Sequence, residues 1–132
     1  MREIIFRAKC IDNGEWVYGV PIKKALAGSH DGYYPKIIPE CDGRHQTIYS
    51  TAIKEETLGQ YTGLTDKNGT KIFEGDIIRD ADGDVMIVKW LTEGATFVLE
   101  PKPYVSVHFY STLPSEIEVI GNVHDNPELL KE

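Results

Sequence analysis

Apolar and polar residues alternate at the start of the chain, a pattern typical of a half-buried β-strand. The alternation covers residues 3–10 and resumes over residues 15–20, where aromatic and aliphatic positions recur at every second residue. Asn13 and Gly14 lie between the two segments. Asn-Gly favours a tight hairpin turn because both residues tolerate positive φ. The pattern therefore predicts a β-hairpin over residues 3–20.

The second half of the chain is denser in strand patterns than residues 21–57. Short apolar segments recur there, separated by turns rich in Gly and Pro, and this spacing is typical of an all-β sandwich or small barrel. The expected strands are Leu58–Thr62, Lys71–Phe73, Asp76–Arg79, Val85–Trp90, Thr96–Glu100, Val105–Tyr110 and Ile117–Val123. At the end of the chain, Asn126 and Pro127 predict a short helix, with Leu129 and Leu130 docking it on the barrel.

These patterns predict an all-β protein of two subdomains. The first, residues 1–57, is an irregular β-rich part that contains the hairpin. The second, residues 58–132, is a small barrel that ends in a helical turn. At 132 residues, the chain has the length of one ordinary domain or of two small subdomains.

The charge is unevenly divided between the two halves. Residues 1–57 hold eight basic and eight acidic residues, whereas residues 58–132 hold six basic and thirteen acidic ones, so the net charge of −7 lies entirely in the second half. Phosphate backbones repel an acidic surface. The second half is therefore a poor candidate for binding nucleic acid.

Cysteine usage and hydropathy indicate a cytoplasmic protein. Cys10 and Cys41 are the two cysteines and form no CxxC pair. Cys10 is in phase with apolar Phe6 and Ala8, which predicts a buried thiol and no structural disulfide. The charges in residues 1–10 exclude a secretory signal, and no apolar stretch is long enough to span a bilayer. We therefore expect residence in the cytoplasm and no membrane partner.

The glycines of the segment 60–78 could suggest a phosphate-binding loop. A P-loop, however, needs Gly-Lys-Ser/Thr leading into a helix, whereas Gly69 leads into a strand pattern. Gly63, Gly69 and Gly75 are better explained as backbone positions that need positive φ or close strand approach.

Two acidic or mixed clusters could suggest a metal. Asp80, Asp82 and Asp84 have the spacing of the first calcium ligands, but the later Gly and Glu positions of such a loop are absent. A type I′ turn at Asp82-Gly83, with solvated carboxylates, explains them better. The segment 30–45 offers a mixed zinc set without the paired short spacing of zinc fingers, namely His30, Asp31, Cys41 and His45. We expect incidental polar residues in a loop.

The sequence shows no pairing of a nucleophile with a base. Serines and threonines lack a G-x-S-x-G context, and neither cysteine has a histidine beside it at a strand-to-helix turn. We therefore expect no catalytic residue, metal ligand, cofactor or small-molecule substrate. An enzyme whose groups meet only in the folded chain stays open as one alternative.

Three segments of the chain resemble the YopX family of small phage and prophage proteins. They are REIIFRA (Arg2–Ala8), QYTGLTDKNGTKIFEGDII (Gln60–Ile78) and IGNVHDNPELL (Ile120–Leu130). The central segment is the most specific because it orders many positions around fixed glycines. The resemblance implies an all-β fold whose second half is SH3-like, and it implies no activity, because the family is uncharacterised.

Aromatic residues in the neutral first half are the remaining candidate for a functional surface. Aromatic side chains beside basic ones suit either a protein interface or base stacking. The expected interaction residues are Arg7, Lys9, Trp16, Tyr18, Tyr33 and Tyr34. The leading hypothesis is a non-catalytic interaction protein, either self-associating as a homo-oligomer or binding a host or phage protein. A nucleic-acid-binding module acting through the first half is the alternative.

Overall fold

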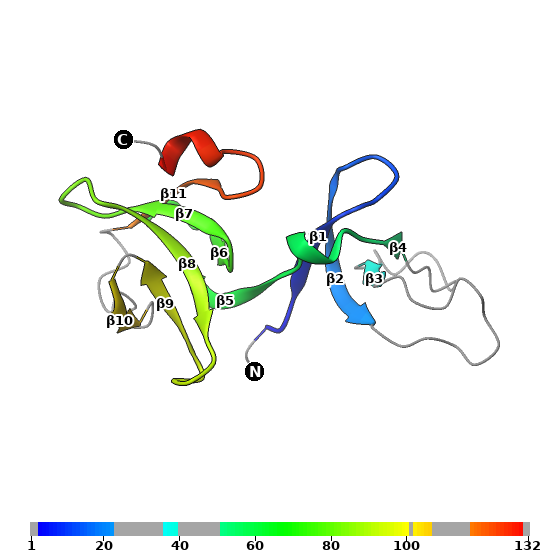
Figure 1. The fold of residues 1–132 in the computed structure, drawn as a ribbon, viewed down its shortest axis with the longest axis horizontal. Helices are drawn as coiled ribbons and strands as arrows, with labels where there is room; N and C mark the ends of the chain where they lie inside the picture. The colour runs from blue at the N-terminus through cyan, green and yellow to red at the C-terminus, as the bar shows by residue number, and fades with distance from the viewer. Residues whose placement is uncertain (1–2, 23–35, 40–50, 101, 107–116, 131–132) are drawn as a thin grey trace. The chain divides into compact units, whose positions relative to one another are not determined.

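The structure is a computed structural model that describes residues 3–22, 36–39, 51–100, 102–106 and 117–130 (Figure 1). Within these residues every long element is a strand, and the helical elements are two 3-10 turns, η1 (Glu55–Thr57) and η4 (Pro127–Leu130). The all-β prediction is confirmed. The chain divides into two compact units. We call Ile4–Gln60 the N-terminal unit, and Tyr61–Glu132 with the residues up to Glu3 the C-terminal unit.

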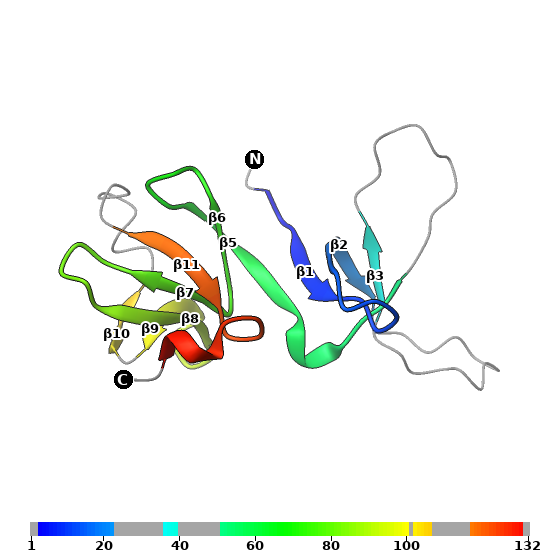
Figure 2. The same cartoon turned by 90° about the horizontal axis from the view of Figure 1, so that it is seen from above.

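The N-terminal unit is built on antiparallel strands in the order β4-β3-β2-β1, of which Figure 2 shows β1, β2 and β3 from above. Their bounds are β1 Phe6–Lys9, β2 Trp16–Ile22, β3 Lys36–Pro39 and β4 Thr51–Ala52. One face of this sheet is covered by Ile53 and by Leu58, which follows η1. Its buried residues Ala8, Ile37 and Ile53 are all at most 1% exposed. The opposite face of β1 and β2 carries Arg7, Lys9, Trp16 and Tyr18.

The predicted hairpin is present, but its turn differs from the prediction. Cys10 N–H donates to the Glu15 carbonyl and Gly14 N–H donates to the Cys10 carbonyl, each at 2.9 Å, which closes a four-residue loop. Gly14 has φ +71°, whereas Asn13 does not have positive φ. The Asn13 side chain instead accepts the Glu15 N–H at 2.9 Å, so asparagine stabilises the loop through its oxygen rather than through its backbone.

The alternation in the sequence places Ile4 in phase with Phe6, Ala8 and Cys10, and the structure differs at this first position. Ile4 is 58% exposed and Ile5 is 4% exposed, because β1 begins only at Phe6 and the alternation before it shifts by one residue. From Phe6 onward the predicted phase is correct. Cys10 is 6% exposed and is a free thiol, which confirms the prediction for this cysteine.

Strand β5 (Gly59–Thr65) pairs with β1 through Gln60 and Gly59 and with β6 (Lys71–Phe73) through its later residues. The C-terminal unit then adds an antiparallel sheet in the order β10-β9-β8-β7-β11. Its strands are β7 Asp76–Arg79, β8 Val85–Leu91, β9 Thr96–Glu100, β10 Lys102–Ser106 and β11 Glu118–Asn122. Strands β6, β7 and β9 have the predicted bounds. The closure of this sheet into an SH3-like barrel stays a prediction.

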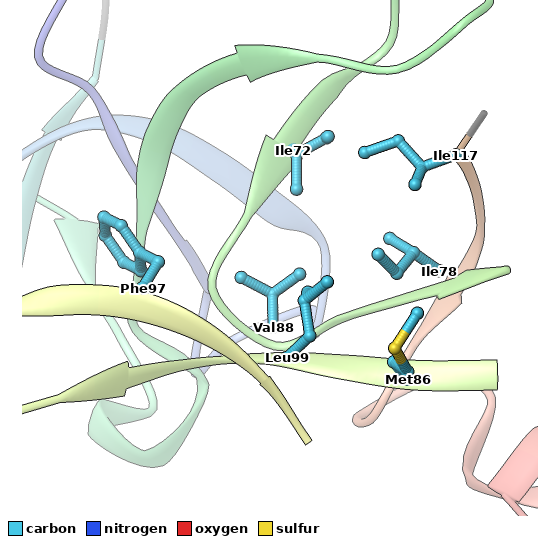
Figure 3. Close-up of a cluster of buried hydrophobic side chains, with 7 residues drawn as sticks. All are labelled: Ile72, Ile78, Met86, Val88, Phe97, Leu99 and Ile117. Carbon is cyan, nitrogen blue, oxygen red and sulfur yellow. The ribbon is translucent and has the colours of Figure 1, made fainter. Parts of the chain in front are cut away.

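The core of the C-terminal unit gathers apolar side chains from the four strands β6, β7, β8 and β9 and from the residue that precedes β11 (Figure 3). All of these residues are at most 6% exposed. They are Ile72, Ile78, Met86, Val88, Phe97, Leu99 and Ile117, with Leu64 and Val119 packed against them. Burial of such side chains contributes about 1.5–3 kcal/mol each. This core explains why the apolar run of β8 was recognisable in the sequence.

Candidate interaction surface

In the glycine-rich segment 60–78, the buried carboxylate of Asp66 has a structural role. This residue is 4% exposed. Its Oδ1 accepts the N–H groups of Asn68 and Thr70, and its Oδ2 accepts the N–H of Val119, all at 2.9 Å. The nearby Lys67 N–H donates to the Ile117 carbonyl at 3.1 Å. Asp66 therefore joins the loop before β6 to strand β11, 53 residues further along the chain.

The environment of Asp66 favours its ionised form. Burial raises the pKa of this carboxyl, but the three backbone N–H donors and the charge of Lys67 outweigh burial, so the pKa lies below the ordinary value of 3.8. Hydrogen bonds to a carboxylate stabilise the charged state more than the neutral one. Asp66 is thus a charged structural group, and its bonds leave it no evident role in binding a ligand.

Two further glycines of the segment 60–78 also have backbone roles. Gly63 has φ +90° within the register shift between β5 and β6, as a bulge requires. Gly75 has φ +91°, and it lies in the turn where the Phe73 N–H donates to the Asp76 carboxylate at 2.7 Å. The prediction of positive φ at these glycines is confirmed. The segment therefore carries the fold and offers no phosphate-binding loop.

The Asp80–Asp84 loop repeats the hydrogen bonds of the Asp66–Thr70 loop. Asp80 Oδ1 accepts the N–H groups of Asp82 and Asp84 at 3.0 and 2.9 Å. Gly83 has φ +87° but Asp82 does not have positive φ, so the type I′ prediction is wrong. Both loops are three-residue turns in which only the glycine is left-handed. The carboxylates of Asp80, Asp82 and Asp84 approach within 4.8 Å, and the aspartate oxygen that orders the loop is already engaged.

The terminal segment Ile120–Leu130 is also held together by hydrogen bonds and close packing. Asn122 Oδ1 accepts the N–H groups of His124 and Asp125 at 3.0 and 2.9 Å, while Asn126 Oδ1 accepts the Asn122 N–H at 3.2 Å. A Cβ on Gly121 would lie 2.6 Å from Asn126 Oδ1. The predicted helix is the single turn η4. Leu129 Cδ1 lies 2.9 Å from the place of a Cβ on Gly121, so Leu129 packs on β11 as the docking prediction expected, although Leu129 and Leu130 stay 37% and 40% exposed.

Four of the six predicted interaction residues lie on one face of the β1–β2 hairpin. Arg7 is directly opposite Tyr18, and Lys9 is directly opposite Trp16. Residues on the other side of these strands, such as Ala8 and Val17, face the core. Since successive residues of a strand point to opposite faces, the four side chains share the face that points away from that core.

The basic and aromatic side chains of this face are in contact. The Arg7 guanidinium carbon lies 4.7 Å from the centroid of the Trp16 ring, and Lys9 Nζ lies 5.5 Å from it. Both distances are within the range of a cation–π interaction. Arg7 is only 8% exposed, whereas Tyr18 is 40% exposed. The cations therefore hold Trp16 in place, and Tyr18 is the more accessible aromatic ring.

The same face continues along β2 to two residues that are not among the predicted interaction residues. Val20 is 56% exposed and Ile22 is 37% exposed. Val20 and Ile22 continue the alternation that identified Trp16 and Tyr18. An apolar residue in such an alternation fits a core position as well as an exposed one, so the sequence did not mark them as surface residues. We call Arg7, Lys9, Trp16, Tyr18, Val20 and Ile22 together the hairpin face.

The remaining predicted residues lie outside the described part of the chain. Tyr33 and Tyr34 of the predicted surface are among them, as is the zinc set of His30, Asp31, Cys41 and His45. Within the residues that the structure describes, the Asp80 loop is the one group of acidic, histidine or cysteine side chains close enough to hold a metal. In the same part of the chain, no helix is long and apolar enough to cross a membrane.

The fold defines a small all-β protein, and comparison places it in a family. The YopX protein family matches residues 5–131. The chain therefore belongs to the YopX family. It is also similar to a solved structure, the crystal structure of protein EF1440 from Enterococcus faecalis, with 25% identity and a TM-score of 0.60 over 99% of this chain and 100% of that one. No curated protein matches it.

Proposed function

We propose that this chain is a phage- or prophage-encoded interaction module without catalytic activity, and that it binds another protein through the hairpin face. The observation that carries the proposal is the continuous row of Trp16, Tyr18, Val20 and Ile22 on one side of β2, with the last three each at least 37% exposed. Contiguous exposed apolar residues mark interaction sites more often than isolated ones do.

The chemistry of the face favours a protein partner over nucleic acid. Exposed aromatic rings next to basic groups are the commonest anchors of protein interfaces. The Trp16 ring already contacts Arg7 and Lys9, which competes with the stacking of a base on that ring. Val20 and Ile22 add aliphatic surface that offers nothing to a phosphate backbone.

Nucleic-acid binding is the second candidate, because Arg7, Lys9, Trp16 and Tyr18 do share one face. Base stacking on Tyr18 with phosphates near Lys9 would resemble single-strand binding surfaces. Such binding must weaken steeply with salt. Titration of a fluorescent single-stranded oligonucleotide at low and high salt tests it, and flat signals at low salt would remove this candidate.

Site-specific photo-crosslinking in cells of the source organism tests the proposed function. A benzophenone amino acid at Tyr18 should give a covalent adduct that protease removes and nuclease does not. The matched control is the same amino acid at Ile11, which is 43% exposed in the loop of the same hairpin but lies off the hairpin face. Equal adducts at both positions, or none at Tyr18, would contradict the proposal. An adduct that nuclease removes would support the alternative.

A further inference from the structure

We propose that the occupant of the hairpin face is the acidic C-terminal unit of a second copy of this chain. This inference rests on the proposed function and names its partner. The contact would join two different surfaces, one from each unit, so it is heterologous and can extend from copy to copy into rings or open chains. It differs from a symmetric dimer, in which two hairpin faces would meet.

The first argument is charge. Ile4–Gln60 holds seven basic and seven acidic residues, and its net charge is therefore zero. Tyr61–Glu132 holds six basic and thirteen acidic residues, which gives −7. The strand positions of the hairpin face carry Arg7 and Lys9 and no acidic residue. The C-terminal unit of the same chain therefore carries the negative charge that would complement this face.

The second argument is that four of the six basic residues in Tyr61–Glu132 already have acidic partners within the unit. Lys67 and Arg79 lie 3.6 and 3.4 Å from Glu118, Lys71 lies 2.8 Å from Glu3, and Lys89 lies 3.0 Å from Glu100. These pairs offset part of the negative charge locally. The excess includes three exposed acidic residues, which are Asp82, Glu93 and Glu128. A basic and aromatic surface is the partner that such an excess attracts.

The third argument is that apolar contact and charge act together on this face. Tyr18, Val20 and Ile22 would supply the area removed from water, while Lys9 would orient an acidic surface at one end of the row. Interfaces of this type gain affinity from the apolar anchors and selectivity from the charges. Exposed charge pairs are screened within a Debye length of about 3 Å at 1 M salt. Self-association should therefore weaken, but not vanish, at high salt.

Sedimentation velocity with two complementary variants tests the inference. The face variant carries Lys9→Glu and Tyr18→Ser, and the acid variant carries Asp82→Lys, Glu93→Lys and Glu128→Lys. We expect the wild-type chain to associate as its concentration rises about a hundredfold, and each variant alone to lose association by at least about tenfold in apparent dissociation constant. Circular dichroism shows whether each variant is folded.

Mixing the two variants separates a heterologous contact from a symmetric one. The acid variant keeps an intact hairpin face, and the face variant keeps an intact acidic unit. An equimolar mixture should therefore form a one-to-one complex that neither variant forms alone. A symmetric contact between two hairpin faces cannot be restored in this way, because only one of the two faces is intact.

A matched charge control reverses Asp12, Glu15 and Glu56 to lysine, three exposed acidic residues of the N-terminal unit. This variant changes the net charge as much as the acid variant does, and it should keep its self-association. Loss of association in this control would mean that net charge alone is responsible, and would overturn the inference.

The possible failures are distinguishable. A wild-type chain that stays monomeric at every concentration, or a mixture that forms no complex, overturns the second copy as partner but leaves the proposed function to its own crosslinking test. Association that the face variant retains in full overturns the second copy as the occupant of the hairpin face, because self-association then uses another surface. The proposed function is decided separately, by the crosslinking at Tyr18.

Discussion

Replacing Asp66 with alanine is expected to lower the free energy of unfolding of the C-terminal unit by about 2–4 kcal/mol. The substitution removes the acceptor of three backbone N–H groups, one of which belongs to Val119 in strand β11. A buried donor that loses its partner costs about 1–3 kcal/mol. The loop before β6 would also lose its link to β11, so the effect should extend beyond the loop itself.

Asp80→Ala is the matched control for this prediction. Asp80 accepts two backbone N–H groups in a loop of the same geometry, but both belong to its own loop. Its removal should cost less than about 1 kcal/mol. Urea unfolding followed by tryptophan fluorescence measures the difference. In a Trp16→Phe background, Trp90 alone reports on the C-terminal unit, since the chain has two tryptophans. Equal losses for the two variants would contradict the structural role given to Asp66.

Acid should act on the same group. The pKa of Asp66 in the folded chain lies below its ordinary value of 3.8, so the unfolded chain binds the proton more readily than the folded chain does. The stabilisation is therefore complete above the ordinary pKa and is lost as the pH falls through the lower folded value. Urea unfolding below about pH 4 should show a falling midpoint for the wild type.

Asp66→Asn provides the control for the pH dependence. Asparagine keeps one oxygen acceptor and replaces the other with an NH₂ donor, which cannot accept the Val119 N–H together with those of the loop. We expect a variant less stable than wild type at neutral pH, with a shallower loss of stability in acid. An acid profile parallel to that of the wild type would show that other carboxylates dominate.

Gly121→Ala is expected to destabilise the C-terminal unit by about 1–3 kcal/mol. The added Cβ would lie 2.6 Å from Asn126 Oδ1 and 2.9 Å from Leu129 Cδ1, so the Asn126 side chain must move. Its hydrogen bond from the Asn122 N–H would then be lost. The turn η4 should detach, which hydrogen exchange of the Leu129 amide can measure.

Gly94→Ala is the matched control for this substitution. A Cβ at Gly94 would meet the flexible end of Leu91 at 3.3 Å and the Thr96 methyl carbon at 3.5 Å, which is an ordinary contact distance. Alanine there should change stability by less than about 0.5 kcal/mol. Fast exchange of the Leu129 amide in the wild-type chain would contradict the prediction for Gly121, because the turn would then already be detached.

The strands were accessible from the sequence because their signals are local. Period-two alternation and the glycines between apolar runs gave β6, β7 and β9 with the observed bounds. The loop conformations were harder to predict from the sequence. The side-chain oxygens of Asp66 and Asp80 accept backbone N–H groups of their own loops. These hydrogen bonds favour a three-residue turn with one left-handed glycine over the two-residue turn that an Asp-Gly pair predicts.

The candidate surface was predictable only in part. Basic and aromatic residues at alternate positions of a hairpin are bound to share a face once the register is known, and Arg7 opposite Tyr18 follows from it. The same alternation contains Val20 and Ile22, and an apolar residue gives no sign by itself of whether it faces a core or water. Only the side on which Ile37 and Ile53 pack decides that question.

The sequence by itself determined the all-β class, the main strands, the family and the place of the negative charge, because each depends on residue type and short spacing. The tertiary structure decided which carboxylates are structural and which side of the hairpin is exposed. Asp66 meets Val119 across 53 residues, and Ile53 covers one side of β1 from a segment distant in the chain. Such contacts depend on strand order and register, which no local pattern encodes.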